Sequence, residues 1–489
     1  MHRSRPLLVG LLVAVSWSPL VFLAASGASA GGAASPAAFG NALLFALGGA
    51  TVATLLGSGA GLLLGTLEFP GRRAITVLLM LPLVAPPAFW WLGLRRLPGL
   101  GLDRLNGIVP AVMIAGFALA PVPYLLVLAA TREAPRTAYS AARLILSPGR
   151  RLLHVLLPLV VSAATGGFLL TTVLLAGESE LPFLLGFRTS MTDAITSFAR
   201  VFDVGVAAAS AAPVVVAVLA LSGVAARPLL RTLLPTALGS NLGIIRHRAT
   251  LALGVPLLLS LPLAGALGGY FVQALGAPGD SRPSSLVSIP TAAMSVAEPV
   301  ATAWLALSLG VGAGYLARRS SRLLRFTLAA GVVLACVPTA VCAIGWIGIG
   351  QQLGGSVPPL FAHALHSWGL GALAFGAAHA RLPRSLENAS RLIPVSSLRR
   401  AFALTLPSVA SSLVAASVLT AALVYSDRDV ASLMLPPGGE RLMLDLYLRA
   451  ANAPSGVVSA LALIVLGYAL VAAALAGGGS WLVLRVGRG

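Results

Sequence analysis

Lysine is absent from this 489-residue sequence, and charged residues of any kind are scarce. Only 10% of the residues are charged, whereas a soluble domain carries about 25%. A phosphate-binding loop of the form G-x-x-x-x-G-K-[ST] requires a lysine for the nucleotide phosphates. The sequence therefore excludes ATP binding by this motif. We expect no enzyme activity, and any ATP hydrolysis that drives the protein belongs to a separate subunit.

Cysteine is almost as rare. Cys336 and Cys342 lie in one apolar stretch, which is typical of small buried hydrophobic residues rather than of a disulfide framework or a zinc site. No His, Cys, Asp and Glu residues occur at metal-ligand spacing, so we expect no metal and no cofactor. His363 and His366 lie three residues apart on a predicted helix and can face each other, and we expect them to have a structural role.

Apolar residues are abundant. They make up 57% of the chain, and the mean hydropathy is +0.93. A helix needs about 20 apolar residues to cross a bilayer, where its backbone must satisfy its own hydrogen bonds. Residues 6–67 contain no charge and fit two spans around a turn near 26–36. Further spans are predicted at 74–94, 105–131, 155–177, 204–226, 249–271, 288–317, 326–350, 357–380, 403–425 and 456–476.

The predicted fold class is therefore an all-α polytopic membrane protein with about 12 transmembrane helices. We expect a first half at 1–226, a basic cytoplasmic linker at 227–248 and a second half at 249–489, with six helices in each half. The apolar runs are continuous rather than alternating, which argues against a β-barrel. The run at 6–25 is long for a signal peptide, so we expect an uncleaved first span.

The arginines indicate the orientation. If the N-terminus is cytoplasmic, most of the 33 arginines lie on the cytoplasmic side, together with only Glu68, Glu133 and Glu387 of the 14 acids. The positive-inside rule then places both termini in the cytoplasm and the protein in the cell inner (plasma) membrane. The same rule accounts for the net charge of +19, so we expect a lipid bilayer and no nucleic acid as a partner.

The two halves share a repeated segment. The first copy is LILSPGRRLLHVLLP at 144–158, and the second is IPVSSLRRAFALTLP at 393–407. An offset of 249 residues aligns Ser147 with Ser396, Arg150 and Arg151 with Arg399 and Arg400, and Pro158 with Pro407. Residues 70–94 and 318–348 form a second pair, each with a basic turn and a proline-broken apolar helix. Six spans separate the copies, so the repeat is parallel about a pseudo-twofold axis along the membrane normal.

The repeated segment resembles the EAA loop of type I ABC-importer permeases, in which Glu-Ala-Ala is followed by a glycine and then by Leu-Pro. In that family the loop is a coupling helix that docks on the ATPase subunit. The resemblance implies a fused two-domain permease with two copies of an ABC ATPase subunit and a periplasmic substrate-binding protein as partners. It implies ATPase-coupling positions at Ala141, Ala142, Arg143, Ser147, Pro148, Arg150, Arg151, Glu387, Ala389, Arg391, Ser396, Arg399 and Arg400.

The sequence departs from this pattern. Tyr139 and Asn388 stand where the family has its glutamate, unless Glu387 serves by a shift of one residue, and Ile145 and Pro394 stand near the family's glycine. The loops therefore lack the family residues at these positions, and the two copies differ from each other there.

The stretch ASLMLPPGGERLMLDLY at 431–447 is similar to the outer loop of fused iron(III)-type permeases, and residues 177–205 follow the same scheme less closely. This resemblance implies iron(III) as the solute, with thiamine and phosphonate relatives. The expected outer-face contacts for the solute or the binding protein are Glu178, Glu180, Asp427 and Asp429.

A proton- or sodium-coupled secondary transporter with six-plus-six helices is the alternative. Such proteins usually carry acidic residues inside the helix bundle. Here Glu298 is the only acid predicted inside a span, near its outer end, where we expect it to reach the interface or to pair with a neighbouring helix. One such acid is little support for ion coupling.

Overall fold

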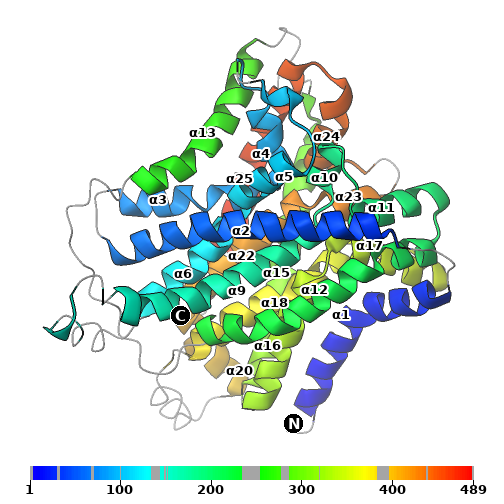
Figure 1. Cartoon of the computed structure of the whole chain (residues 1–489). Helices are drawn as coiled ribbons and strands as arrows, with labels where there is room; N and C mark the ends of the chain where they lie inside the picture. Colours follow the sequence, from blue (N-terminus) through cyan, green and yellow to red (C-terminus); the bar gives the residue numbers. More distant parts are fainter. Residues whose placement is uncertain are drawn as a thin grey trace.

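The described part of the protein is all-helical, and no strand occurs in it (Figure 1). The computed structural model describes residues 4–29, 34–67, 71–99, 101–133, 142, 144–147, 150, 152–233, 254–276, 286–318, 320–380, 382, 396–436 and 439–486. Several long helices begin with a capping serine or with a proline in the first turn. Ser35, for example, accepts a hydrogen bond of 3.3 Å from the N–H of Ala38, and Pro36 follows at the first helical position.

The helices form two consecutive series. The first series is α1 (Ser4–Ser29), α2 (Pro36–Thr66), α3 (Arg72–Leu78), η1 (Leu81–Val84), α4 (Pro87–Leu94), η2 (Leu102–Arg104), α5 (Ile108–Leu119), α6 (Pro121–Glu133), η3 (Leu152–Leu156), α9 (Leu157–Ala176), α10 (Glu180–Leu184), α11 (Ser190–Val201) and α12 (Val204–Leu233). The second series is α13 (Gly254–Leu275), α15 (Ile289–Ala317), α16 (Ser321–Cys336), α17 (Thr339–Gln352), α18 (Pro359–Ala380), α20 (Ser397–Arg400), η5 (Ala401–Thr405), α21 (Leu406–Ser408), α22 (Ala410–Ser426), α23 (Arg428–Met434), α24 (Leu442–Asn452) and α25 (Ser455–Val486).

Six helices in the described ranges are long and apolar enough to cross a membrane. They are Arg5–Ala28, Pro36–Thr66, Ile108–Thr131, Val204–Ala226, Ile289–Ala317 and Ser455–Leu484. Three bent helix pairs raise the number to nine, and two shorter apolar helices lie at Val160–Ala176 and Ser260–Leu275. These helices confirm the expectation of an all-α, membrane-embedded protein, whereas the count of 12 stays a prediction.

Three of the expected spans are bent rather than straight. The helices Ala74–Val84 and Pro87–Leu94 meet at 100°, and Ser321–Cys336 and Thr339–Gln352 meet at 96°. Proline lies at both breaks and lacks the N–H that would continue the helix, as the sequence indicated. The third bend lies in the span predicted at 403–425, where the chain bends by 70° between Ser408 and Ala410.

Local structure repeats along with the sequence. The segments Leu152–Leu156 and Ala401–Thr405 are both π-helical, and they lie 249 residues apart, which is the offset of the repeated Ser-x-x-Arg-Arg segment. In both copies the apolar helix that follows leads to a short helix, α10 or α23. α12 continues to Leu233, beyond the boundary expected at 226, and residues 234–253 lie outside the described residues.

The first helix of each series packs against the bent helix of the other series. α1 lies against α17, where Gly345 leaves room for Pro19, and α13 lies against α4. A Cβ atom added at Gly269 of α13 would overlap the carbonyl oxygen of Gly93 in α4. Two close approaches that depend on glycine therefore tie the halves together.

Gly269→Ala should destabilise the protein by about 1–3 kcal/mol, because a methyl group cannot enter the contact between α13 and α4 without displacing backbone. Gly268→Ala is the matched control, since nothing lies within 4 Å of a Cβ at that position in the same helix. The measurement is the thermal unfolding midpoint in detergent. Equal midpoints for the two variants would contradict the close packing of α13 on α4.

Candidate functional site

Two short helices position the acids that the sequence singled out. Glu178, just before α10, accepts hydrogen bonds from the backbone N–H groups of Glu180 (2.9 Å) and Leu181 (3.2 Å). Asp427, just before α23, accepts one from the N–H of Val430 (3.2 Å). Glu178 and Asp427 are equivalent at the 249-residue offset. Both satisfy backbone donors at the start of a helix, as capping residues do.

The next two residues of each copy reach across to the other half. Ser179 donates to the carboxylate of Asp429, with 3.1 Å to each oxygen. Arg428 Nε lies 3.6 Å from Glu180 Oε1. The offset pairs Ser179 with Arg428 and Glu180 with Asp429, so these two contacts are equivalent under the repeat. We call Glu178, Ser179, Glu180, Asp427, Arg428 and Asp429 the acid junction.

In the acid junction Ser179, Glu180, Asp429 and the side chain of Asp427 are buried, and Glu178 and Arg428 are half-buried. Its carboxyl groups differ in acidity. Burial raises the pKa of Glu178, and it raises that of Glu180 well above its ordinary value. Burial and the charge of Asp427 raise the pKa of Asp429 to about 7. Burial also acts on Asp427, but the hydrogen bond and charge of His363 outweigh it, and the pKa of Asp427 falls below its ordinary value. The junction can therefore hold protons near neutral pH beside one carboxylate that stays ionised.

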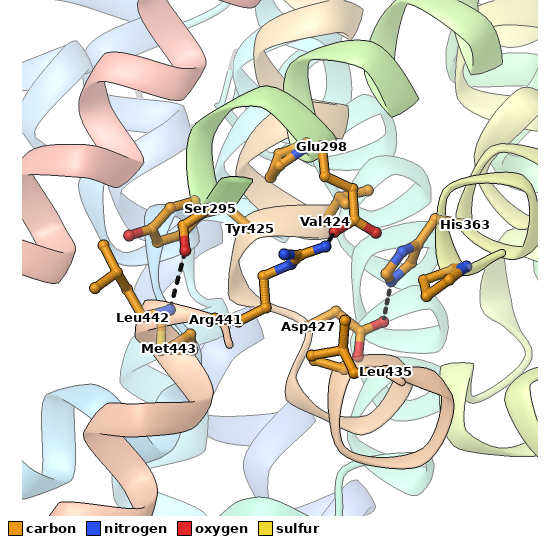
Figure 2. A pocket seen from close by; sticks show the side chains of 13 residues that line it. Ser295, Glu298, His363, Val424, Tyr425, Asp427, Leu435, Arg441, Leu442 and Met443 are labelled. Atoms are coloured by element: carbon orange, nitrogen blue, oxygen red, sulfur yellow. Dashed lines mark hydrogen bonds and ion pairs between the residues drawn. The ribbon is translucent and has the colours of Figure 1, made fainter. Parts of the chain in front are cut away.

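A pocket adjoins the acid junction within the second half (Figure 2). Asp427 forms part of its wall, and His363 Nε2 lies 3.2 Å from Asp427 Oδ2. Arg441 points toward Glu298 of α15 and forms an ion pair with it. We call this space the inner pocket. Residues of α15, α18, α22, α23 and α24 and of the segment between α23 and α24 line it, so all of its described lining belongs to the second half.

A wider pocket, here called the outer pocket, lies next to the inner one. The two share Glu298, Pro359, Leu435 and Arg441 in their walls, so the Glu298–Arg441 ion pair stands between them. The outer pocket encloses about 1330 Å³, including space open to solvent. It lies at the end of the bundle where α15 and α18 begin.

The sequence located the acids of the junction but missed how they are paired. It expected Glu298 to find a partner, and the partner is Arg441. Arg441 lies between two predicted helices, and no spacing rule connects it to a residue 143 positions earlier. His366 contacts Cys342, with 3.5 Å between Nδ1 and Sγ, and both cysteines are buried and free.

The structure describes six of the expected coupling residues. Ser147, Arg150, Ser396 and Arg399 are exposed, Arg400 is half-buried and Ala142 is buried. Ser396 accepts a 3.2 Å hydrogen bond from the N–H of Arg399 at the start of α20. The other coupling positions lie outside the described residues: Ala141, Arg143, Pro148, Arg151, Glu387, Ala389 and Arg391.

Among the described residues, no group of three or more His, Cys, Asp or Glu side chains is arranged to hold a metal ion. Comparison of the chain with protein-family models, with curated proteins and with solved structures found no match.

Stability should fall as the pH rises through neutrality. The folded pKa of Asp429 is about 7, whereas an unfolded aspartate has a pKa of about 3.9. The folded state therefore binds more protons between these values, and the stabilisation present below about pH 4 is lost as the pH rises to 7. Asp429→Asn should reduce this loss by roughly 1–4 kcal/mol.

The measurement is the unfolding midpoint of the detergent-solubilised protein at pH 5 and pH 8. Asp445→Asn is the control, because Asp445 is a half-buried carboxylate 2.8 Å from Arg449 on the same helix and outside the acid junction. An Asp429→Asn protein with an unchanged pH dependence would mean that Asp429 is ionised in the folded state.

Proposed function

We propose that the chain is the membrane-spanning permease subunit of an ATP-driven ABC importer. It passes a small solute, delivered by a periplasmic binding protein, across the cell inner membrane, and both its termini are cytoplasmic. The observation that carries the proposal is the repeated Ser-x-x-Arg-Arg segment, which a π-helical turn follows in both halves. One site with the same sequence and local backbone in each half suits a partner that binds as two copies.

The exposed side chains beside this segment support a docking role. Leu144 and Ile145 are 89% and 81% exposed, and Arg150 is exposed nearby. Aliphatic side chains next to an arginine fit a protein interface, where arginine pairs with carboxylates through two parallel hydrogen bonds. The same arginines also suit lipid headgroups, and the prediction below separates the two roles.

The contacts between the halves suggest how movement is transmitted. When the ATPase subunits close, they draw the two coupling segments together. α1 and α13 each pack on the opposite half, so each half moves with part of the other. The acid junction also links the halves, through Ser179–Asp429 and Arg428–Glu180. In this mechanism these contacts break and re-form as the path opens and closes.

One observation favours a second candidate, a proton-coupled secondary transporter. The carboxyl groups of Glu178, Glu180 and Asp429 are buried, and the pKa of each is raised. Buried carboxyl groups with such pKa values suit proton relays in transporters. An importer does not need them to titrate, so the dependence of uptake on a proton gradient distinguishes the two functions.

The proposed identity of the solute has a single source in the sequence. Iron(III), with thiamine and phosphonates as relatives, follows only from the resemblance of the loop at 431–447. Glu178, Glu180, Asp427 and Asp429 remain the proposed contacts for the solute or its binding protein.

Charge reversal at Arg399 and Arg400 should abolish solute uptake while membrane insertion and folding stay unchanged, because the coupling segment then repels the acidic groups of the ATPase. The measurement is ATP-dependent uptake in whole cells, with the membrane content of the protein quantified in parallel. Reversal of Arg322 and Arg325 is the control, since these exposed arginines belong to α16. Both double variants lose the same positive charge on the predicted cytoplasmic side.

Wild-type uptake by the Arg399→Glu/Arg400→Glu protein would contradict the coupling role. An equal loss in the Arg322→Glu/Arg325→Glu protein would assign the effect to headgroup anchoring. Uptake that collapses with the proton gradient but not with ATP depletion would favour the secondary transporter.

A further inference from the structure

The outer pocket carries an unbalanced charge. Among the described residues, the charged ones that line it are Glu298, Glu440 and Arg441. Glu298 and Arg441 neutralise each other as an ion pair, whereas Glu440 accepts a 2.7 Å hydrogen bond from the hydroxyl of Thr291. The described lining therefore bears a formal charge of −1, because it holds two carboxylates and one guanidinium group.

The outer pocket runs down one face of α15. Pro290, Thr291, Met294, Ala297, Glu298 and Ala301 line it, and their spacing of three and four residues places them along one side of a helix. From Pro290 to Ala301 the helix rises by eleven steps of 1.5 Å, or about 16 Å. Glu298 lies toward the Ala301 end of this stretch and is only 9% exposed. A ligand that reaches it therefore leaves bulk water.

The charges of this pocket belong to the second half alone. Ser35 and Ser288 cap equivalent helices, which places Phe45, Ala46 and Leu47 of α2 at the level of Glu298. At the start of α11, Thr189 occupies the position that Arg441 has at the start of α24. The first half therefore has neither the acid nor the base of the Glu298–Arg441 ion pair at the equivalent positions, and Arg188 stands at the position of Glu440.

We propose that the outer pocket is a binding site for a small primary ammonium compound with an aliphatic body. A monovalent cation brings the charge of the lining to zero, whereas an anion or a neutral molecule does not. The proposal rests on the proposed function only for the side of the membrane that the pocket faces. The ammonium class was not predicted from the sequence, which indicated iron(III) from the loop at 431–447.

The lining discriminates among cations. A primary ammonium group donates three hydrogen bonds, and the carboxylate of Glu440, with the hydroxyls of Ser288 and Thr291 beside it, can accept them. No aromatic side chain is among the described residues that line the pocket, so a quaternary ammonium ion finds among them none of the ring faces that usually bind it. Met294, Leu360, Leu435 and four prolines supply an apolar wall for a short alkyl chain.

The test is a direct binding measurement on the purified full-length protein in lipid nanodiscs, by isothermal titration calorimetry with n-butylammonium chloride. Protein-free nanodiscs correct for partition into lipid. We expect saturable binding of n-butylammonium, and at least about tenfold weaker binding of n-butanol, butyrate and tetramethylammonium, because a charge-assisted hydrogen bond is worth about this factor. Equal binding of n-butanol or of tetramethylammonium, or tighter binding of butyrate, would overturn the proposal.

Two variants locate the site. Glu440→Gln should weaken n-butylammonium binding by about tenfold, and Glu440 is exposed, so the substitution leaves the folded core intact. Asp445→Asn removes a carboxylate five residues away, which pairs with Arg449 and does not line the pocket, and should bind as the wild type does. Equal affinity of the Glu440→Gln and wild-type proteins would overturn the assignment.

A second substitution probes the depth of the site without leaving a lone buried charge. Glu298→Gln combined with Arg441→Gln keeps the net charge and should still bind n-butylammonium through Glu440. Longer alkylammonium ions should bind more tightly, because their apolar ends then meet neutral side chains that cost less to desolvate than an ion pair. Unchanged affinity for n-hexylammonium would contradict binding along α15. No ATPase subunit takes part in these measurements, so their failure leaves the proposed permease function untouched, and failure of that function leaves the binding result standing.

Discussion

A charge buried in an apolar bundle must be compensated by another group, and in this protein the compensating groups come from distant parts of the chain. The hydroxyl of Ser179 donates a hydrogen bond to Asp429, Arg428 lies beside Glu180, and Arg441 forms an ion pair with Glu298. Removing one member of such a pair strands the other in a medium that solvates it poorly. These contacts therefore fix how the two halves are placed at this end of the bundle. Two of them join the halves, and the third joins α15 to the residue that precedes α24.

Glycine contacts hold the halves together elsewhere. α1 packs on α17 of the second half, and α13 packs on α4 of the first half (Figure 1). Gly345 and the Gly93–Gly269 pair allow these helices to approach closely. Small residues are the usual means of helix association in lipid, where burial of apolar surface gives little advantage. The two halves are therefore joined by polar pairs at one end and by close helix packing elsewhere. We infer that small movements of one half against the other can break the polar pairs.

Much of the fold could be read from the sequence, because long apolar runs dictate membrane helices and prolines mark their breaks. The repeat was visible at Ser147 and Ser396, and the π-helical turns that follow lie at the same offset. The side-chain contacts between distant parts of the chain could not be predicted from the sequence. Arg441 meets Glu298, and Ser179 meets Asp429, only because tertiary packing brings them together, and neither residue type nor spacing encodes such a contact. The bend after Ser408 was also missed, although Pro407 lies just before it, because proline also fits the first turn of a helix and does not by itself mark a break.

The central claim is that this chain works as the permease of an ATP-driven importer, and the most direct test is what it binds in its own membrane. The measurement is affinity purification of the full-length protein from its native membrane in mild detergent, with quantitative mass spectrometry of the proteins that accompany it. The account predicts an ATPase subunit with a lysine-containing phosphate-binding loop at two copies per chain. A chain that purifies alone and still carries solute down an imposed proton gradient would contradict it.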